Sequence, residues 1–99
     1  MSDDPNIELE ITDDGGRYIV ATPDGDQARL IYRRVDAKHW IATSTFVPVP
    51  YRGNGIAERM VERLVKDART AGAKITPACW FVADELKRMS PQWDDVWMR

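Results

Sequence analysis

A glycine-rich corner that leads directly into an amphipathic run is the part of this sequence best suited to chemistry. The corner reads RGNGIA at residues 52–57. The first amides of a helix have no partners inside the helix, and the helix dipole adds partial positive charge there. Because glycine has no Cβ, an anion can closely approach the backbone at Gly53 and Gly55, while Arg52 supplies a fixed charge beside them. We therefore expect the corner to bind a phosphate group.

Two common nucleotide-binding loops do not fit this corner. A P-loop ends in Gly-Lys-Ser/Thr, whereas Gly55 is followed by Ile, Ala and Glu, with no lysine or hydroxyl. A dinucleotide-binding loop has a third glycine and follows the first strand of its domain. Here Glu58 stands at the third position, and four strands are expected upstream. Both nucleotide-binding classes are therefore disfavoured.

The residues before the corner have the patterns of β-strands. Residues 6–12 alternate apolar and polar side chains, as a strand with one wet face does. Turn signals of the type DDGG and PDGD separate this segment from two further apolar segments. The expected strands are residues 6–12, 17–22, 27–35 and 40–47. Their short connections predict an antiparallel meander.

The residues after the corner predict a long helix and a crossover. Apolar residues recur at helical spacing over residues 56–71, and Gly72 stands where a C-terminal cap is expected. Residues 73–82 resume a strand-like run, and residues 83–89 suggest a short second helix. A strand–helix–strand crossover makes its strands parallel, whereas hairpins are antiparallel. The expected fold is therefore α+β, with a mixed and mostly antiparallel sheet.

Length, charge and composition narrow the classes of partner. With 99 residues, of which 43% are apolar, the chain is expected to form one domain over residues 1–99. A formal net charge of −2 gives no basic field for nucleic acid or anionic lipid. One cysteine and one histidine predict neither a disulfide nor a metal site. The acidic N-terminus and the lack of a long apolar run predict a cytoplasmic protein that does not enter a membrane.

The pattern at residues 52–57 resembles the Arg/Gln-x-x-Gly-x-Gly/Ala signature of the GNAT acetyltransferases, in which this loop holds the pyrophosphate of acetyl coenzyme A. The order of elements over residues 6–89 is similar to the core of that superfamily. Val47-Pro48, the run PACWFV at residues 77–82, and a proline followed by an aromatic at residues 91–93 also resemble a branch of short single-domain members. The resemblance implies a GNAT-type sheet with one long helix after the fourth strand, a short C-terminal helix, and acetyl coenzyme A as co-substrate.

The resemblance and the corner together suggest a set of site residues. The cofactor-binding residues are expected to be Val47, Tyr51, Arg52, Gly53, Asn54, Gly55, Ile56, Ala57 and Arg59. Cys79, expected on the fifth strand, is the candidate acid for the departing thiolate or a possible acetyl acceptor, and otherwise a small buried apolar residue. Glu85 is the candidate base. No metal ion is expected to take part.

This sequence departs from the branch around the expected reaction centre. The branch often carries His-Thr-Glu where residues 44–46 read Ser-Thr-Phe, and Glu85 and Ser90 align with an aromatic residue and a histidine of the branch. The residues expected to bind the cofactor match the branch more closely than the polar residues expected to take part in the reaction. The aromatic residues Trp80, Phe81, Trp93 and Trp97 are expected in the core or at an interface.

Two prolines predict a gap in the sheet. Pro48 follows the fourth expected strand and Pro77 lies within the fifth, and proline cannot donate a hydrogen bond to a neighbouring strand. Alternatively, Pro48 ends its strand and Pro77 faces an edge. If the strands part, as the resemblance implies, the backbone of residues 45–47 is free to bind the pantetheine arm, and one N–H could polarise the thioester carbonyl.

Three functions remain open from the sequence. The first is an N-acetyltransferase with an open acceptor site, which suits a protein or peptide amine. The second is a module that binds acetyl coenzyme A or coenzyme A, or serves as an interaction scaffold, without turnover. The third is a small α+β domain whose glycine loop binds nothing. A monomer or a weak dimer is expected.

Overall fold

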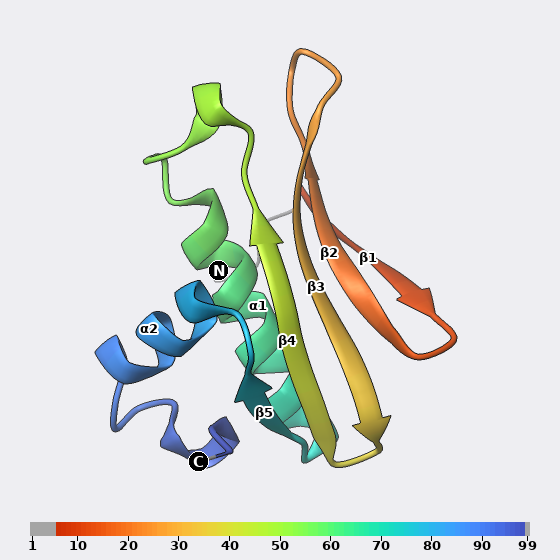
Figure 1. Cartoon of the computed structure of the whole chain (residues 1–99), viewed down its shortest axis with the longest axis vertical. Helices are drawn as coiled ribbons and strands as arrows, with labels where there is room; N and C mark the ends of the chain where they lie inside the picture. The colour runs from red at the N-terminus through yellow and green to blue at the C-terminus, as the bar shows by residue number, and fades with distance from the viewer. Residues whose placement is uncertain (1–5, 99) are drawn as a thin grey trace.

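The computed structural model describes residues 6–98 as a five-stranded sheet with two α-helices and two short 3-10 helices (Figure 1). The strands lie in chain order across the sheet. The elements are β1 (Ile7–Thr12), β2 (Gly15–Ala21), β3 (Gln27–Asp36), β4 (His39–Phe46), η1 (Val49–Tyr51), α1 (Ile56–Ala71), β5 (Lys74–Pro77), α2 (Trp80–Arg88) and η2 (Asp94–Val96). The expected α+β fold is confirmed. Residues 1–5, part of the basis for the cytoplasmic prediction, lie outside the described residues.

Strands β1 to β4 form the predicted antiparallel meander. Alternate side chains face α1, and among them Tyr18 and Leu30 are fully buried. The first turn is tighter than DDGG suggests, because Gly15 and Gly16 belong to β2. A Cβ on Gly15 would lie 2.1 Å from the carbonyl oxygen of Tyr32, so the close approach of β3 leaves no room for a side chain there.

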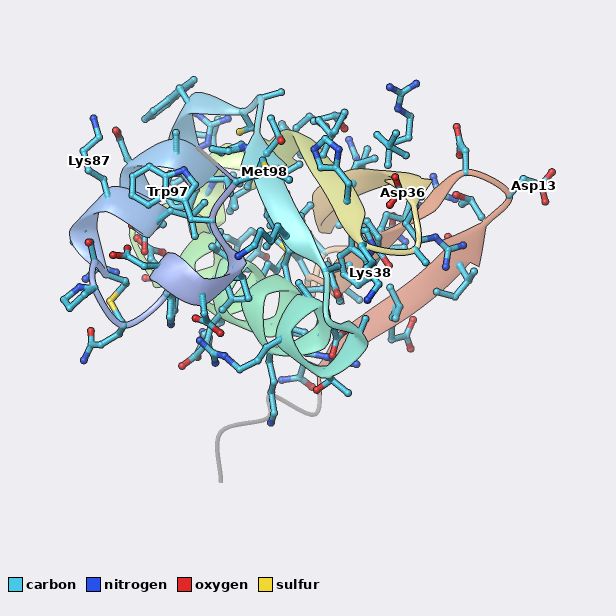
Figure 2. The ribbon with its side chains drawn as sticks, turned by 90° about the horizontal axis from the view of Figure 1, so that it is seen from below. Asp13, Asp36, Lys38, Lys87, Trp97 and Met98 are labelled. Atoms are coloured by element: carbon cyan, nitrogen blue, oxygen red, sulfur yellow. The ribbon has the colours of Figure 1, made fainter. Side chains whose placement is uncertain are left out.

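Helix α1 covers one face of the sheet, as Figure 2 shows from below. Its buried side chains follow the predicted apolar stripe: Met60, Val61, Leu64, Val65 and Ala68. The Tyr18 hydroxyl in β2 donates a hydrogen bond to Asp67 in α1 at 2.7 Å, and burial, reinforced by this carboxylate, raises the pKa of the phenol. The chain leaves the helix through Gly72, whose φ of 71° gives the left-handed cap that the sequence predicted.

Strands β4 and β5 pair in parallel over only part of their length. The pairing runs from His39 opposite Lys74 to Ala42 opposite Pro77. Beyond Pro77 the amides of Ala78 and Cys79 both donate to the Ala42 carbonyl oxygen, each at 3.0 Å, and this turns the chain out of the sheet. The predicted separation of the strands at Pro77 is confirmed.

The second half of β4 therefore has a strand on one side only. Residues 43–46 lie next to β3, and no strand of the described chain pairs with them on the other side (Figure 1). Thr43 lies at a break in the β3–β4 register, between the pairs Ile31–Ser44 and Tyr32–Ala42. A bulge of this kind bends a strand and increases its twist. The free edge of β4 is thus directed toward the start of α2.

The prediction of a strand over residues 73–82 was too long, and the second helix begins earlier than residue 83. The apolar residues 80–82 suggested a strand, but they form the first turn of α2. Val82 and Leu86 are fully buried, at the helical spacing of one face, whereas Trp80 is 75% exposed. Cys79 is accordingly the N-cap of α2, not a residue of β5.

The C-terminal segment covers the outer edge of β5. Trp93 is buried, as predicted, but its helical spacing with Trp97 reflects only the short 3-10 helix η2. The amide of Met98 donates to the Ile75 carbonyl oxygen at 2.8 Å, so the chain returns alongside β5. Main-chain bonding therefore closes one edge of the sheet.

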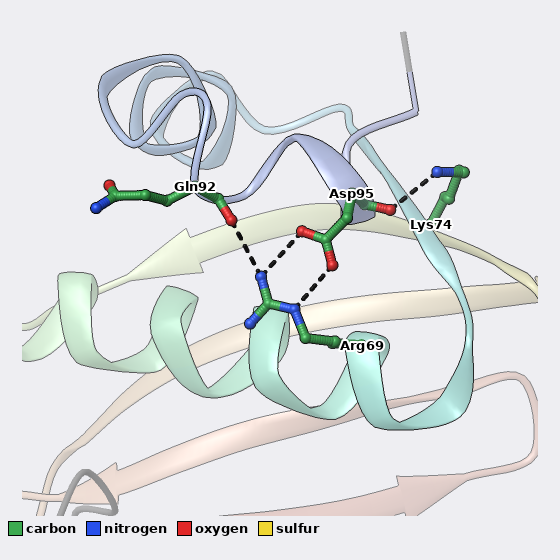
Figure 3. Close-up of polar contacts among 4 residues, drawn as sticks. All are labelled: Arg69, Lys74, Gln92 and Asp95. Atoms are coloured by element: carbon green, nitrogen blue, oxygen red, sulfur yellow. Dashed lines mark hydrogen bonds and ion pairs between the residues drawn. The ribbon is translucent and has the colours of Figure 1, made fainter.

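A cluster of polar contacts fastens this segment to α1 and β5 (Figure 3). Two guanidinium nitrogens of Arg69 contact the two carboxylate oxygens of Asp95, at 2.8 and 2.9 Å. One of these nitrogens also donates to the Gln92 carbonyl oxygen at 3.2 Å, and the Lys74 ammonium donates to the Asp95 carbonyl oxygen at 2.9 Å. The bidentate hydrogen bonds from Arg69 lower the pKa of the Asp95 carboxyl below its usual range.

We predict that Arg69→Gln lowers the free energy of unfolding by about 0.5–1 kcal/mol at pH 7, because the ion pair is largely exposed. The pKa of Asp95 is lower in the folded state, so its contribution is present above the unfolded value of about 4 and is lost as the pH falls through the folded pKa. The difference between wild type and variant in urea unfolding should therefore shrink below about pH 4. Arg34→Gln, which breaks no ion pair in the described chain, is the control; a difference that persists undiminished in acid would contradict the prediction.

Candidate functional site

A cavity of about 470 Å³ lies where the end of β4, the glycine corner, the start of α1 and the start of α2 meet. Its position follows from the separation of β4 and β5, since α2 begins where a continuing β5 would have run. The residues lining it are Thr45, Phe46, Val47, Tyr51, Arg52, Gly53, Gly55, Ile56, Ala57, Glu58, Cys79, Trp80 and Phe81. The cavity therefore joins the corner to Cys79.

The corner depends on two left-handed glycines. Gly53 and Gly55 have φ values of 85° and 83°, which other residues rarely adopt. Apart from each glycine and its neighbours along the chain, no atom of residues 6–98 lies within 4 Å of the position that a Cβ would take, so the space beside the backbone is open. Gly53 is exposed and Gly55 half-buried. The loop is thus accessible from outside, as binding of an anion requires.

The first amides of α1 are available at this corner. Gly55 is the N-cap, and no side chain of the described residues caps the helix. The amides of Ile56, Ala57 and Glu58 are those that a helix cannot satisfy internally. With the helix dipole, they form a site of partial positive charge at the cavity wall.

Arg52 adds a full charge at the same wall. Its Nε donates to the Val47 carbonyl oxygen at 2.7 Å, which ties the guanidinium to the end of the strand. The guanidinium carbon lies 6.0 Å from the centre of the Phe46 ring. No carboxylate of residues 6–98 forms an ion pair with Arg52, so its charge is not neutralised locally in that part of the chain. Guanidinium and amides together can hold a diphosphate group.

The structure brings most of the predicted cofactor-binding residues to this cavity. Seven of the nine line it: Val47, Tyr51, Arg52, Gly53, Gly55, Ile56 and Ala57. Asn54 lies in the corner without lining the cavity, and its carbonyl oxygen accepts a hydrogen bond from Arg59 at 3.5 Å. Arg59 is likewise absent from the lining. It lies one turn along α1, where its side chain meets the outer surface of the corner.

Cys79 faces the free edge of β4. Its thiol contacts the Thr45 hydroxyl at 3.5 Å, and both residues line the cavity. Cys79 is half-buried and precedes the first turn of α2. The candidate acid therefore lies in the cavity, although α2 rather than a strand positions it.

Glu85 lies elsewhere. It is a buried residue of α2, its carboxylate contacts the Arg88 guanidinium at 2.5 Å, and it does not line the cavity. The structure therefore does not bring the candidate base together with Cys79. His39 lies at the other end of β4, where its ring contacts the Thr76 hydroxyl at 2.7 Å.

Five cavity residues were not predicted as site residues: Thr45, Phe46, Glu58, Trp80 and Phe81. Trp80 was expected in the core or at an interface, but it is largely exposed and lines the cavity beside Phe81, whose ring lies 6.1 Å away, edge to face. Phe46, at the end of β4, is 39% exposed. Glu58 lies in the first turn of α1. The signal for Glu58 was its place three residues after the N-cap, whereas the exposure of the aromatics depends on where α2 begins.

The described chain contains no group of three or more histidine, cysteine, aspartate or glutamate side chains that could hold a metal ion. Among residues 6–98, no helix is long and apolar enough to cross a membrane.

Comparisons with known proteins agree with this arrangement. The family model for the GCN5-related N-acetyltransferases matches residues 17–96, which include the corner, both helices and four of the five strands. A solution NMR structure of a GCN5-like protein from Staphylococcus aureus has the same fold, with a TM-score of 0.66 and 20% identity over 96% of this chain and 91% of that one. A search of the curated proteins finds no match. The family match covers most of the chain and spans the residues that form the cavity, and on that basis the protein belongs to the GCN5-related N-acetyltransferase (GNAT) family.

Proposed function

We propose that this protein transfers an acetyl group from acetyl coenzyme A to an exposed amine. The observation that carries the proposal is the continuity of one cavity from the helix-start amides and Arg52 to Cys79, along a strand edge that has no neighbour. Acetyl coenzyme A needs an anion site for its diphosphate and a channel for its pantetheine arm, with the thioester beyond. Family membership supports the same activity.

Binding of the diphosphate is assigned to the corner. The amides of residues 56–58 and the Arg52 guanidinium present hydrogen-bond donors at the cavity wall, and Arg52 forms no ion pair with the described carboxylates. Gly53 and Gly55 keep the approach open, because their missing side chains leave the backbone uncovered. The fit rests on these donors and on the open space beside them.

Binding of the pantetheine arm is assigned to the free edge of β4. Residues 43–46 extend past the last β4–β5 pair, so their outer edge can pair with the amides of an extended ligand, as an added strand would. The apolar side chains of Val47, Ile56 and Phe81 lie along the same cavity and suit the methylene and methyl groups of such an arm.

The reaction we propose is direct transfer. The acceptor nitrogen attacks the thioester carbonyl, the C–N bond forms and the C–S bond breaks, and the thiolate takes up a proton as the amine loses one. We propose that Cys79 gives that proton; its position in the cavity supports this role, and the thiolate can recover a proton from solvent or from the amine. The cavity lining contains no histidine, and Glu85 is held by Arg88. We therefore propose that the amine arrives largely neutral.

A second candidate is a module that binds coenzyme A without turnover. The observation that favours it is the same lack of a histidine, together with a phenylalanine at position 46 where the related branch often has glutamate. Both candidates require the corner to bind the cofactor.

We predict that Arg52→Glu weakens coenzyme A binding by about 100-fold or more, because the variant loses a charge-assisted hydrogen bond and adds repulsion. Isothermal titration calorimetry would measure the change. Arg34→Glu reverses the same charge on β3, away from the cavity lining, and should bind coenzyme A like the wild type. Unchanged affinity in Arg52→Glu would rule out the proposed anion site.

We predict that Cys79→Ala reduces release of coenzyme A thiol from acetyl coenzyme A and an amine by about 10-fold or more, while binding persists, because the variant removes the proposed acid. Thiol release and peptide mass spectrometry would be followed together. Cys79→Ser retains the size of the side chain and serves as control for packing. If wild type binds coenzyme A but releases no thiol with any amine, the binding module is the correct function.

A further inference from the structure

The sheet face opposite α1 is not covered by any helix of residues 6–98. Figure 2 shows α1 on one side of the sheet and only side chains on the other side of β1 to β4. The alternation of β3 places Arg29, Ile31 and Arg33 on this open face, while the intervening residues are buried against α1. Across the β3–β4 register, Ile41 lies opposite Arg33 and Phe46 opposite Arg29. We call these five residues the open-face strip.

The strip carries positive charge that the described chain does not neutralise. Arg17 on β2 belongs to the same face but forms an ion pair with Glu10 at 2.7 Å. Arg29 and Arg33 have no carboxylate partner among residues 6–98. Two arginines without an ion pair on one strand, with half-buried isoleucines beside them, form a cationic surface with an apolar floor.

The strip is continuous with the cavity. The Arg29 guanidinium carbon lies 4.9 Å from the centre of the Phe46 ring, and that of Arg52 lies 6.0 Å from it. Phe46 also lines the cavity. The ring is therefore a shared boundary between the cavity and the open face, and both guanidinium groups lie next to it.

Resting on the proposed function, we propose that the amine acceptor is an acidic polypeptide segment that lies along the open-face strip, with its free amine passing Phe46 into the cavity toward Cys79. Arg29 and Arg33 are separated by about 13 Å along the strand, and two carboxylates on an extended peptide can be separated by the same distance. Two unpaired cations are fewer than a protein needs to neutralise a length of nucleic acid. The isoleucines would contact the peptide side chains between the two carboxylates.

The ordinary pKa of the amine narrows the class of acceptor further. The cavity lining contains no histidine to remove a proton, so the acceptor must itself supply neutral amine near pH 7. An α-amine, whose ordinary pKa is about 8, has a larger neutral fraction near pH 7 than a lysine side chain, whose pKa is about 10.4. The inferred acceptor is therefore the free N-terminus of an acidic chain.

The test is binding and acetylation of a fluorescent peptide of about eight residues with a free N-terminus and several glutamates, matched with a peptide in which each glutamate is glutamine. We expect the acidic peptide to bind more tightly by about 10-fold at low salt and to lose that advantage at about 0.5 M salt. Arg29→Gln and Arg33→Gln should each weaken binding about 3-fold. Arg34→Gln, the adjacent arginine on the core side of β3, should not change it.

Several outcomes would overturn the inference. These are equal binding of the two peptides, an equal loss in Arg34→Gln, or tighter binding of a single-stranded oligonucleotide. The double charge reversal, Arg29→Glu with Arg33→Glu, should instead favour a lysine-rich peptide, and circular dichroism would verify its fold. Coenzyme A affinity measured on the wild type separates the two proposals: if the wild type binds the cofactor but does not distinguish the two peptides, only the acceptor class is wrong. If acidic peptide binds but cofactor does not, the proposed function fails and the docking surface stands.

Discussion

The structure depends on the hydrogen bonds that one carbonyl oxygen accepts. The oxygen of Ala42 accepts the amides of both Ala78 and Cys79, immediately after Pro77 has ended the parallel pairing with β4. A fifth strand that continued alongside β4 would have filled the space that the cavity now occupies. The chain instead turns outward and begins α2, so that a strand edge, a helix start and a thiol come to face one another.

The rest of the fold keeps that arrangement in place. Helix α1 is fixed against the sheet by its buried stripe and by the Tyr18–Asp67 hydrogen bond, so its first turn is presented from a rigid base. The C-terminal segment is fastened by Arg69, which couples the end of α1 to the residues that follow α2. Neither contact lies in the cavity, yet both determine where its two helical walls stand.

Much of this could be predicted from the sequence because the signals were local. The alternation of β1 to β4, the apolar stripe of α1 and the cap at Gly72 each follow from a short pattern, and the proline at position 77 marks where pairing stops. The start of α2 could not be predicted in the same way. An apolar run of three residues fits a strand or a helix equally well, and the choice was made by tertiary contacts of Val82 and Leu86.

The same difference between local patterns and tertiary contacts explains which site residues could be predicted. The corner was predictable because glycine, arginine and a helix start act through their immediate neighbours. The placement of Cys79 opposite Thr45, the burial of Glu85 and the exposure of Trp80 all depend on the rotation of α2, which no local pattern contains. Side chains whose roles depend on a helix's orientation remain the hardest to assign from sequence.

The left-handed glycines have one more consequence. Open space lies beside the backbone at both Gly53 and Gly55, so a side chain would not clash with its surroundings there. Glycine is favoured at these positions because their φ values are positive, which residues with a Cβ rarely adopt. The backbone conformation of the corner is thus fixed before any ligand binds. An anion would bind amide dipoles that are already oriented, and it would not have to order a flexible loop.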